Sequence, residues 1–206
     1  MNTLEIRRRS LETTAALKVR VAPHLPLIEG VEVLRSRDDI VDRALCLHVA
    51  CAVSFGYERK RAWRWIENEG LVQKLTGHEE KLLKHRWASS RQFHMQVEAV
   101  LVLIWAVGIA DAIDFRRPCP ETTERLMPDL LKDEPSGNWR RKAASRDAEE
   151  LLLARDLAYC LHWAVVEAMS RGRELRRVDM PSVPERRKAL EWLFVDEEWD
   201  DISLDT

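Results

Sequence analysis

The chain has 206 residues, of which 46% are hydrophobic and 33% are charged, a composition typical of a globular protein and too apolar for a disordered one. Its net charge of −2 excludes a global field that would recruit nucleic acid or a membrane surface. The longest uncharged run covers the 12 residues 99–110, short of the roughly 20 that a membrane helix needs, so we expect a buried core helix there.

The chain length and the cysteine pattern indicate one domain in a reducing compartment. We expect residues 1–206 to form a single globular domain that needs no disulfide bonds. The four cysteines show no disulfide-like spacing, and the charged start of the chain lacks the apolar stretch of a secretory signal. We therefore expect a reduced, cytoplasmic protein.

Hydrophobic periodicity predicts an all-α fold. The predicted helices, in chain order, cover residues 3–18, 37–55 and 58–68, a segment that begins at Thr76, and residues 89–107, 145–171 and 184–195. No long strand-like alternation, internal repeat or low-complexity tract interrupts them. We expect six to eight helices packed as one domain.

Residues 108–145 differ in composition from the rest of the chain. They contain several helix-breaking residues, namely Pro118, Pro120, Pro128, Pro135 and Gly137, although residues 121–126 can form a short turn. We predict a proline-rich central loop that serves as a lid or a linker. Cys119, between two prolines, is expected to be exposed on it.

Glu98 is the last charged residue before the apolar run, and Trp105 lies two turns later on the same helical face. A carboxylate in this position is expected to be at least half buried, where it needs a partner or takes a raised pKa. His94 and an arginine from another helix are both candidate partners. A structural ion pair and a general acid or base are therefore the two interpretations.

Polar side chains follow two neighbouring lines on the predicted helix 145–171. The first line contains Arg155, Tyr159 and His162, and the second contains Asp156, Trp163 and Glu167. Such a stripe can line a pocket, or it can form a polar inner layer that fixes the packing of the helices. The candidate pocket comprises Glu98, Trp105, Asp156, Tyr159, His162 and Trp163, and none of them is assigned a catalytic role.

The last 22 residues, 185–206, carry three basic and eight acidic residues and two tryptophans, Trp192 and Trp199. Tryptophan presents a large apolar surface that water rejects, so we expect this acidic tail to dock on the body of the protein or on a partner. Its aspartates would then pair with arginines such as Arg35, Arg43 or Arg155. The candidate tail-docking residues are Arg35, Arg43, Glu185, Arg186, Trp192, Trp199, Asp200 and Asp201.

The sequence contains no pattern typical of a metal or nucleotide site. His78 opens a segment like a zinc-protease helix, but Leu82 stands where a second histidine is needed. No glycine-rich phosphate loop is present, so we expect no metal and no cofactor. Residues 58–65 interleave four cations with two tryptophans, which is compatible with nucleic-acid contact, although a helix would turn Trp63 toward the core and the cations toward solvent.

A set of short segments between residues 34 and 206 matches a known pattern. They are Leu34–Ser36 with Arg43, Glu98–Ala99, Trp105–Gly108, Asp156–Leu157, Tyr159, His162–Ala164, Glu185–Arg187, Ala189–Leu190, Trp192–Leu193 and Trp199–Asp201 through Asp205–Thr206. Together they resemble the bacterial domain of unknown function 4272 family. The family pattern has a Trp-Arg pair before the glutamate, where this chain has Met95 and Gln96, so no role of that arginine carries over. The family has no known activity, and the resemblance implies no catalytic residue.

These observations favour a cytoplasmic, all-helical binding protein without catalytic activity, whose partner is another protein; an immunity or antitoxin role is one concrete form. An alternative from a different class is a small-molecule-binding protein or enzyme that uses the cluster of Glu98, Asp156, Tyr159 and His162. A third is nucleic-acid binding through residues 58–65. An exposed apolar patch would favour the first, and convergent, solvent-reachable side chains the second.

Overall fold

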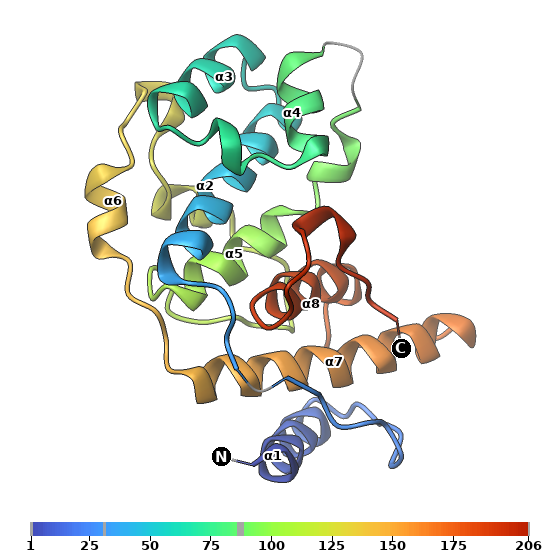
Figure 1. The fold of residues 1–206 in the computed structure, drawn as a ribbon. Coiled ribbons are helices and arrows are strands. Elements are labelled where there is room, and N and C mark those ends of the chain that lie inside the picture. The colour runs from blue at the N-terminus through green and yellow to red at the C-terminus, as the bar shows by residue number, and fades with distance from the viewer. Residues whose placement is uncertain (1, 31, 86–88, 206) are drawn as a thin grey trace.

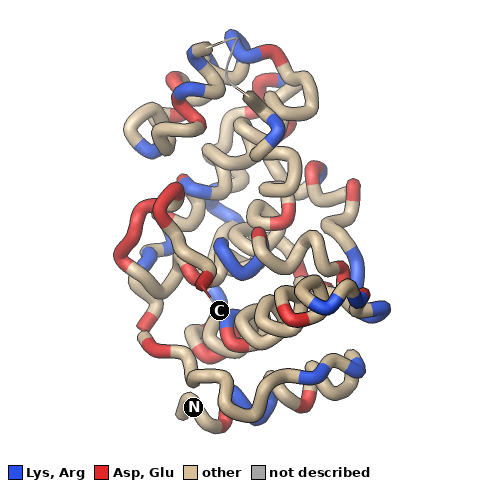
Figure 2. Tube along the Cα trace, turned by 90° about the vertical axis from the view of Figure 1, so that its right-hand side faces the viewer, with Lys and Arg blue, Asp and Glu red and all other residues tan. Residues whose placement is uncertain are grey.

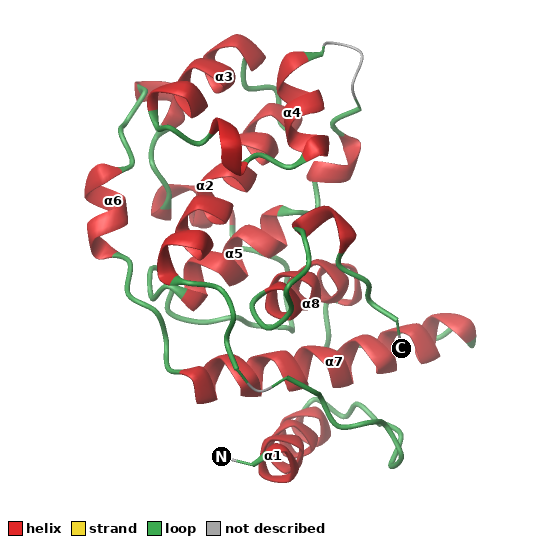
Figure 3. Cartoon of the chain, viewed as in Figure 1, coloured by secondary structure: helices red, strands yellow, loops and turns green. Residues whose placement is uncertain are grey.

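Helices make up all the regular structure within residues 2–30, 32–85 and 89–205, the parts of the chain that the computed structural model describes (Figure 3). The α-helices are α1 (Thr3–Ala16), α2 (Arg37–Ser54), α3 (Arg59–Asn68), α4 (Gly77–Lys84), α5 (Val97–Ala106), α6 (Gly137–Lys142), α7 (Ala148–Ser170) and α8 (Val183–Trp192). Short 3-10 helices lie between and after them: η1 (Val72–Lys74), η2 (Arg91–Phe93), η3 (Glu121–Leu126), η4 (Leu130–Lys132), η5 (Met180–Ser182) and η6 (Trp199–Asp201). The prediction of an all-α fold is confirmed.

The helices pack against one another in a series. α1 lies on α7, α7 on α8, α8 on α5, α5 on α2, and α2 on both α3 and α4 (Figure 1). The buried apolar side chains of this series form one continuous cluster, so the chain is a single domain. No helix within the described ranges is long and apolar enough to cross a membrane.

α5 occupies the centre of the series because its sequence is apolar on every side. Each residue from Glu98 to Ala106 is buried, and Glu98 is the one charged side chain on this helix. Gly108 ends the helical segment with a φ of +70°, a left-handed conformation that glycine adopts without a steric penalty. The predicted core helix is therefore the helix that positions Glu98.

The first turn of α5 differs from the prediction. A helix was expected to begin at residue 89 or 90, but the chain forms η2 and reaches α5 only at Val97. Phe93 explains the difference because its buried side chain turns the segment onto α2, where the Cys51 thiol donates to the Phe93 carbonyl at 3.4 Å. The serine side chain at position 89 bonds the N–H of Arg91 at 3.3 Å instead of capping a helix.

Residues 108–145 are more ordered than a simple loop. They contain η3, η4 and the six-residue helix α6, which was not predicted. Trp139 of α6 is buried, and its indole N–H donates to the Leu126 carbonyl at 2.7 Å. Arg140 of α6 forms an ion pair with Asp42 of α2 at 2.6 Å. These contacts fasten the segment to the helical body.

Candidate functional site

The six residues of the candidate pocket divide between α5 and α7. On α7, the Tyr159 ring lies 5.7 Å from the guanidinium of Arg7, the partner of Asp156, and 4.8 Å from that of Arg187, the partner of His162. Three of them, Glu98, Asp156 and His162, are buried and each contacts an arginine. Trp105 packs under the guanidinium of a fourth arginine. The remaining two, Tyr159 and Trp163, line a hollow of about 380 Å³ beside the loop at residues 22–26.

Glu98 is tied to Arg186 of α8. Its Oε2 accepts hydrogen bonds from Arg186 Nε at 2.8 Å and from Nη2 at 2.7 Å. Its Oε1 accepts the backbone N–H of Cys119 at 2.8 Å. Arg186, which is 0% exposed, also donates to the carbonyls of Asp114 and Arg117. The ion pair therefore fastens the loop at residues 114–119 to the α5–α8 interface, and both charged groups are buried.

Asp156 is fully buried and forms an ion pair with Arg7 of α1. Arg7 Nη2 lies 2.8 Å from Asp156 Oδ1, and Arg7 Nε lies 3.1 Å from Oδ2. The same guanidinium donates to the carbonyls of Leu25 and Pro26 at 2.8 and 2.7 Å. This ion pair joins α1, the loop after it and α7.

His162 contacts Arg187 of α8 through Nδ1, at 2.6 Å from the arginine Nη1. Because a guanidinium only donates, Nδ1 accepts and the imidazole is neutral. Burial, together with the positive charge of Arg187, lowers the pKa of His162 to about 4. Arg187 also donates to the carbonyls of Leu204 and Asp205, at 3.2 and 3.1 Å, and so holds the end of the described chain.

Trp105 and Tyr159 both meet arginines through their rings. Arg146 lies 4.9 Å from the Trp105 ring centroid and donates to the Trp105 carbonyl at 2.7 Å. Arg187 lies 4.8 Å from the Tyr159 ring centroid. Burial raises the pKa of the Tyr159 hydroxyl.

The acidic tail folds back onto α8 through its tryptophan. Trp199 of η6 is 2% exposed, and its ring meets Trp192 edge to face, with centroids 5.7 Å apart and an interplanar angle of 71°. The cationic groups of Arg43 and Lys188 lie 5.4 and 5.3 Å from the Trp199 ring centroid. The indole N–H of Trp199 has no hydrogen-bond partner in the described part of the chain.

Arg35 holds the tail by its backbone. It stacks 4.6 Å from the Trp192 ring centroid and donates to the carbonyls of Trp192, Val195 and Glu197 at 3.2, 2.9 and 2.5 Å. Carbonyl oxygens, and not the predicted aspartates, are therefore the acceptors that Arg35 contacts.

Asp200 lies at the beginning of α4. Its Oδ2 accepts the backbone N–H of His78 at 3.3 Å and lies 3.1 Å from His78 Nδ1, where the positive end of a helix favours a carboxylate. Arg43 pairs with Glu79 of the same helix. Burial alone would lower the pKa of Arg43, but the charge of Glu79, helped by that of Asp200, raises it. Asp201 is exposed.

The rest of the tail-docking set belongs to the body. Arg155 pairs with Glu191 of α8 at 2.7 Å. Glu185 of α8 is half-buried, and burial raises the pKa of its carboxyl group. Acidic residues follow one another along residues 196–201 of the tail, with Trp199 between them (Figure 2).

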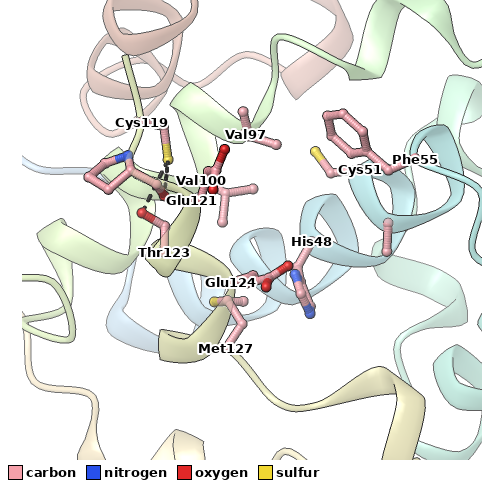
Figure 4. A pocket seen from close by; sticks show the side chains of 12 residues that line it. His48, Cys51, Phe55, Val97, Val100, Cys119, Glu121, Thr123, Glu124 and Met127 are labelled. Carbon is pink, nitrogen blue, oxygen red and sulfur yellow. Dashed lines mark hydrogen bonds between the residues drawn. The ribbon is translucent and has the colours of Figure 1, made fainter. Parts of the chain in front are cut away.

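A larger cavity, of about 520 Å³, lies between α2, α5 and η3 (Figure 4). We call it the α2–α5 pocket. Its lining residues are His48, Cys51, Ala52, Phe55, Val97, Val100, Cys119, Pro120, Glu121, Thr123, Glu124 and Met127. Most of them are apolar, and the polar ones come from α2 and from residues 119–124. This composition is typical of a small-molecule site.

His48 is a neutral acceptor in the α2–α5 pocket. Burial lowers its pKa to about 4. Its Nε2 lies 3.2 Å from the carbonyl oxygen of Pro128, which can only accept, so Nε2 carries the proton and Nδ1 has a lone pair. The carboxylate of Glu124 and the ring of His48 both point into the cavity (Figure 4).

Cys119 is half-buried in the wall of the α2–α5 pocket, which corrects the expectation that it is exposed. Its thiol donates to Thr123 Oγ1 at 3.2 Å, and the backbone bond from its N–H to Glu98 holds the loop in place. Burial raises the pKa of the Cys119 thiol, so it is protonated at neutral pH and a poor nucleophile.

Sequence reasoning did not find the α2–α5 pocket. Its lining comes from residues 48–55, 97–100 and 119–127, which are far apart in the chain. Phe55, a lining residue, follows a helix with a wide apolar face, but its exposure of 65% is visible only in the structure.

Two of the four cations at residues 58–65 contact neighbouring carbonyls and an acid, and the other two, Lys60 and Arg64, are exposed. Arg59 donates to the carbonyls of Leu82 and His85 at the end of α4. Arg61 pairs with Asp133 at 2.9 Å. Trp63, which was predicted to face the core, is half-buried, and Trp65 is buried.

No group of three or more histidine, cysteine, aspartate or glutamate side chains within the described ranges is arranged to hold a metal ion. A family model described as Domain of unknown function (DUF4272) matches residues 7–202. The chain therefore belongs to this family, and the resemblance seen in the sequence is confirmed. No curated protein and no solved structure matches the chain.

Proposed function

We propose that this member of the DUF4272 family is a non-catalytic binding protein, and that its ligand places an apolar group in the α2–α5 pocket. The observation that carries this proposal is the cavity of about 520 Å³ with apolar walls and a few polar groups. Ligand sites in proteins are concave, mostly apolar and typically about 300–1,000 Å³ in volume.

The state of the buried acids supports binding over catalysis. A general acid or base must reach the substrate and exchange its proton. Glu98 and Asp156 are instead buried in ion pairs with arginines. Glu98 also accepts the backbone N–H of Cys119, and both oxygens of Asp156 accept from Arg7. His162 contacts an arginine through the nitrogen that would accept a proton.

Small-molecule titration tests the proposal. A panel of phenylalkyl and alkyl compounds is added to the ¹⁵N-labelled protein, and amide shifts are followed by NMR. We expect shifts in α2, α5 and η3. Ala52→Phe fills the pocket with a larger side chain and should abolish them. Ala154→Phe, at a half-buried alanine of α7 remote from the pocket, is the matched control. A panel without any shift at these elements contradicts the proposal.

Binding of a protein partner is a second candidate function. Three exposed apolar side chains favour it. Phe55 lines the α2–α5 pocket and is 65% exposed, and Met95 and Leu126, which are close in the chain to the lining residues Val97 and Met127, are 41% and 39% exposed. Exposed apolar groups near a hollow are typical of interaction sites. Native mass spectrometry on protein purified gently from its own cells separates the two. A co-purifying small molecule supports the first candidate, and a stoichiometric protein supports the second.

A further inference from the structure

We infer that the α2–α5 pocket binds an apolar amine, with the hydrophobic body inside the cavity and the protonated nitrogen at its mouth. This inference rests on the proposed function and adds the chemical class of the ligand. It depends on the polar lining residues, whose negative charges and acceptor atoms favour a ligand that donates hydrogen bonds.

The carboxylates of η3 form one side of the mouth. Glu121 and Glu124 are exposed and line the pocket. Side chains three residues apart on a 3-10 helix project in the same direction. The two carboxylates and Met127 therefore lie in one row that faces the cavity, whereas Arg125 points about a third of a turn away. An exposed carboxylate is negatively charged at neutral pH and only accepts hydrogen bonds.

Within the described ranges, no cation among the lining residues compensates these carboxylates. The set contains no lysine and no arginine. Behind the Cys119 loop, the buried guanidinium of Arg186 donates to Glu98 and to the carbonyls of Asp114 and Arg117. Its charge is therefore engaged on the far side of the Cys119 loop and does not offset the carboxylates at the mouth.

The other polar and aromatic groups complement the same ligand. His48 presents the lone pair of Nδ1, because its Nε2 proton faces the Pro128 carbonyl. Phe55 lies at the rim, where its ring is held edge to face against His94 with centroids 4.9 Å apart. An aromatic face attracts a cation, so this ring adds a second favourable contact for a protonated amine.

Three ligands with one carbon skeleton test the inference: phenylbutylamine, phenylbutanol and phenylbutyrate. Their dissociation constants are measured by NMR titration at neutral pH. We expect the amine to bind about five- to tenfold more tightly than the alcohol, because each partly exposed carboxylate contributes up to about 1 kcal/mol to a charge pair. The carboxylate should bind most weakly.

Two variants connect the preference to the mouth of the pocket. Glu124→Gln keeps the shape of the side chain and removes its charge. The affinity for the amine should therefore fall about threefold to fivefold, while the affinity for the alcohol should not change. Glu197→Gln removes an exposed charge from the tail and is the matched control, with no change expected.

The outcomes separate this inference from the proposed function. Equal affinities for the three ligands, or tightest binding of phenylbutyrate, overturn the inference of an amine and leave the binding proposal standing. An unchanged amine affinity in Glu124→Gln also overturns it. Absence of binding by all three ligands and by the wider panel overturns both.

Discussion

At the scale of single residues, the buried and half-buried arginines act mainly on backbone carbonyls. Arg7, Arg35, Arg59, Arg146, Arg155, Arg186 and Arg187 each donate to two or more of them. These carbonyls lie in loops or in the last turn of a helix, where no N–H of the same helix reaches them. Guanidinium suits this task because it presents five donors in a fixed plane.

Two neutral histidines make stability depend on pH. The folded-state pKa values of His48 and His162 are about 4, and the value in an unfolded chain is about 6.5. The unfolded state therefore binds protons first as the pH falls below 6.5, and stability decreases. We expect each histidine to lower the free energy of unfolding by about 2 kcal/mol between pH 7 and pH 5, as measured by urea denaturation.

Variants assign this loss to the histidines. His162→Gln retains an acceptor for Arg187 and removes the titrating group, so its stability should depend less on pH. Glu185 acts in the opposite direction, because burial raises its pKa and the folded state takes up its proton first. An equally steep loss in the double variant of His48 and His162 would contradict the assignment.

The sequence predicts the burial of a charge better than it predicts the partner. The apolar face of α5 indicates that Glu98 is buried, and the structure places its side chain in the core. Its partner, Arg186, lies 88 residues later, and the chain offers many other arginines. Only the packing of α8 on α5 selects among them, and that packing is a property of the whole fold.

At the scale of elements, the C-terminal segment acts as a clamp on α8. Trp199→Ala removes the edge-to-face contact with Trp192 and leaves a cavity, which typically lowers the free energy of unfolding by about 3 kcal/mol or more. For a chain of this length we expect a melting temperature lower by about 10 °C, measured by circular dichroism.

A control in the same segment separates packing from charge. Asp201 is exposed, so Asp201→Asn should change the melting temperature by less than about 2 °C. Deletion of residues 197–206 also removes one of the three carbonyls that Arg35 contacts and both of those that Arg187 contacts, and should have at least the effect of Trp199→Ala. An unchanged melting curve after deletion would show that the tail does not stabilise the fold.

Elements with strong periodicity are predictable from this sequence, and short ones are not. α2, α3 and α7 were predicted with ends within a few residues of those observed. α6 has six residues, too few for a helical period to repeat, and it is held by Trp139 and Arg140. The short turn expected at residues 121–126 is present as η3, but its packing beside α2 and α5, which forms the α2–α5 pocket, joins segments far apart in the chain and is not visible in a local pattern.

At the scale of the whole molecule, the serial packing of helices makes α1 the outermost layer. α1 packs on α7, whereas α5 and α8 each have two helical neighbours (Figure 1). The ion pair between Arg7 and Asp156 joins this layer to the core. Regions with fewer buried contacts open with lower free energies than the core, so α1 is expected to open before the rest of the chain.

Arg7→Met tests this order of opening. The variant leaves the fully buried carboxylate of Asp156 without its cation, a change that typically costs about 3–5 kcal/mol. We expect amide hydrogen exchange to accelerate in Thr3–Ala16 and in the facing turns of α7, while α2 and α5 keep their protection. Arg8→Met, at an exposed position of the same helix, should leave the exchange rates unchanged.

The pattern of exchange decides whether α1 is a separate unit. Confined acceleration means that α1 detaches while the series from α7 to α2 stays folded. Uniform acceleration across all helices would contradict this, because it would place α1 in the same cooperative unit as the core. The same variant also tests whether opening of α1 affects ligand binding. In the series, α7 and α8 separate α1 from the helices that line the α2–α5 pocket, so in the first case Arg7→Met should leave ligand affinity unchanged.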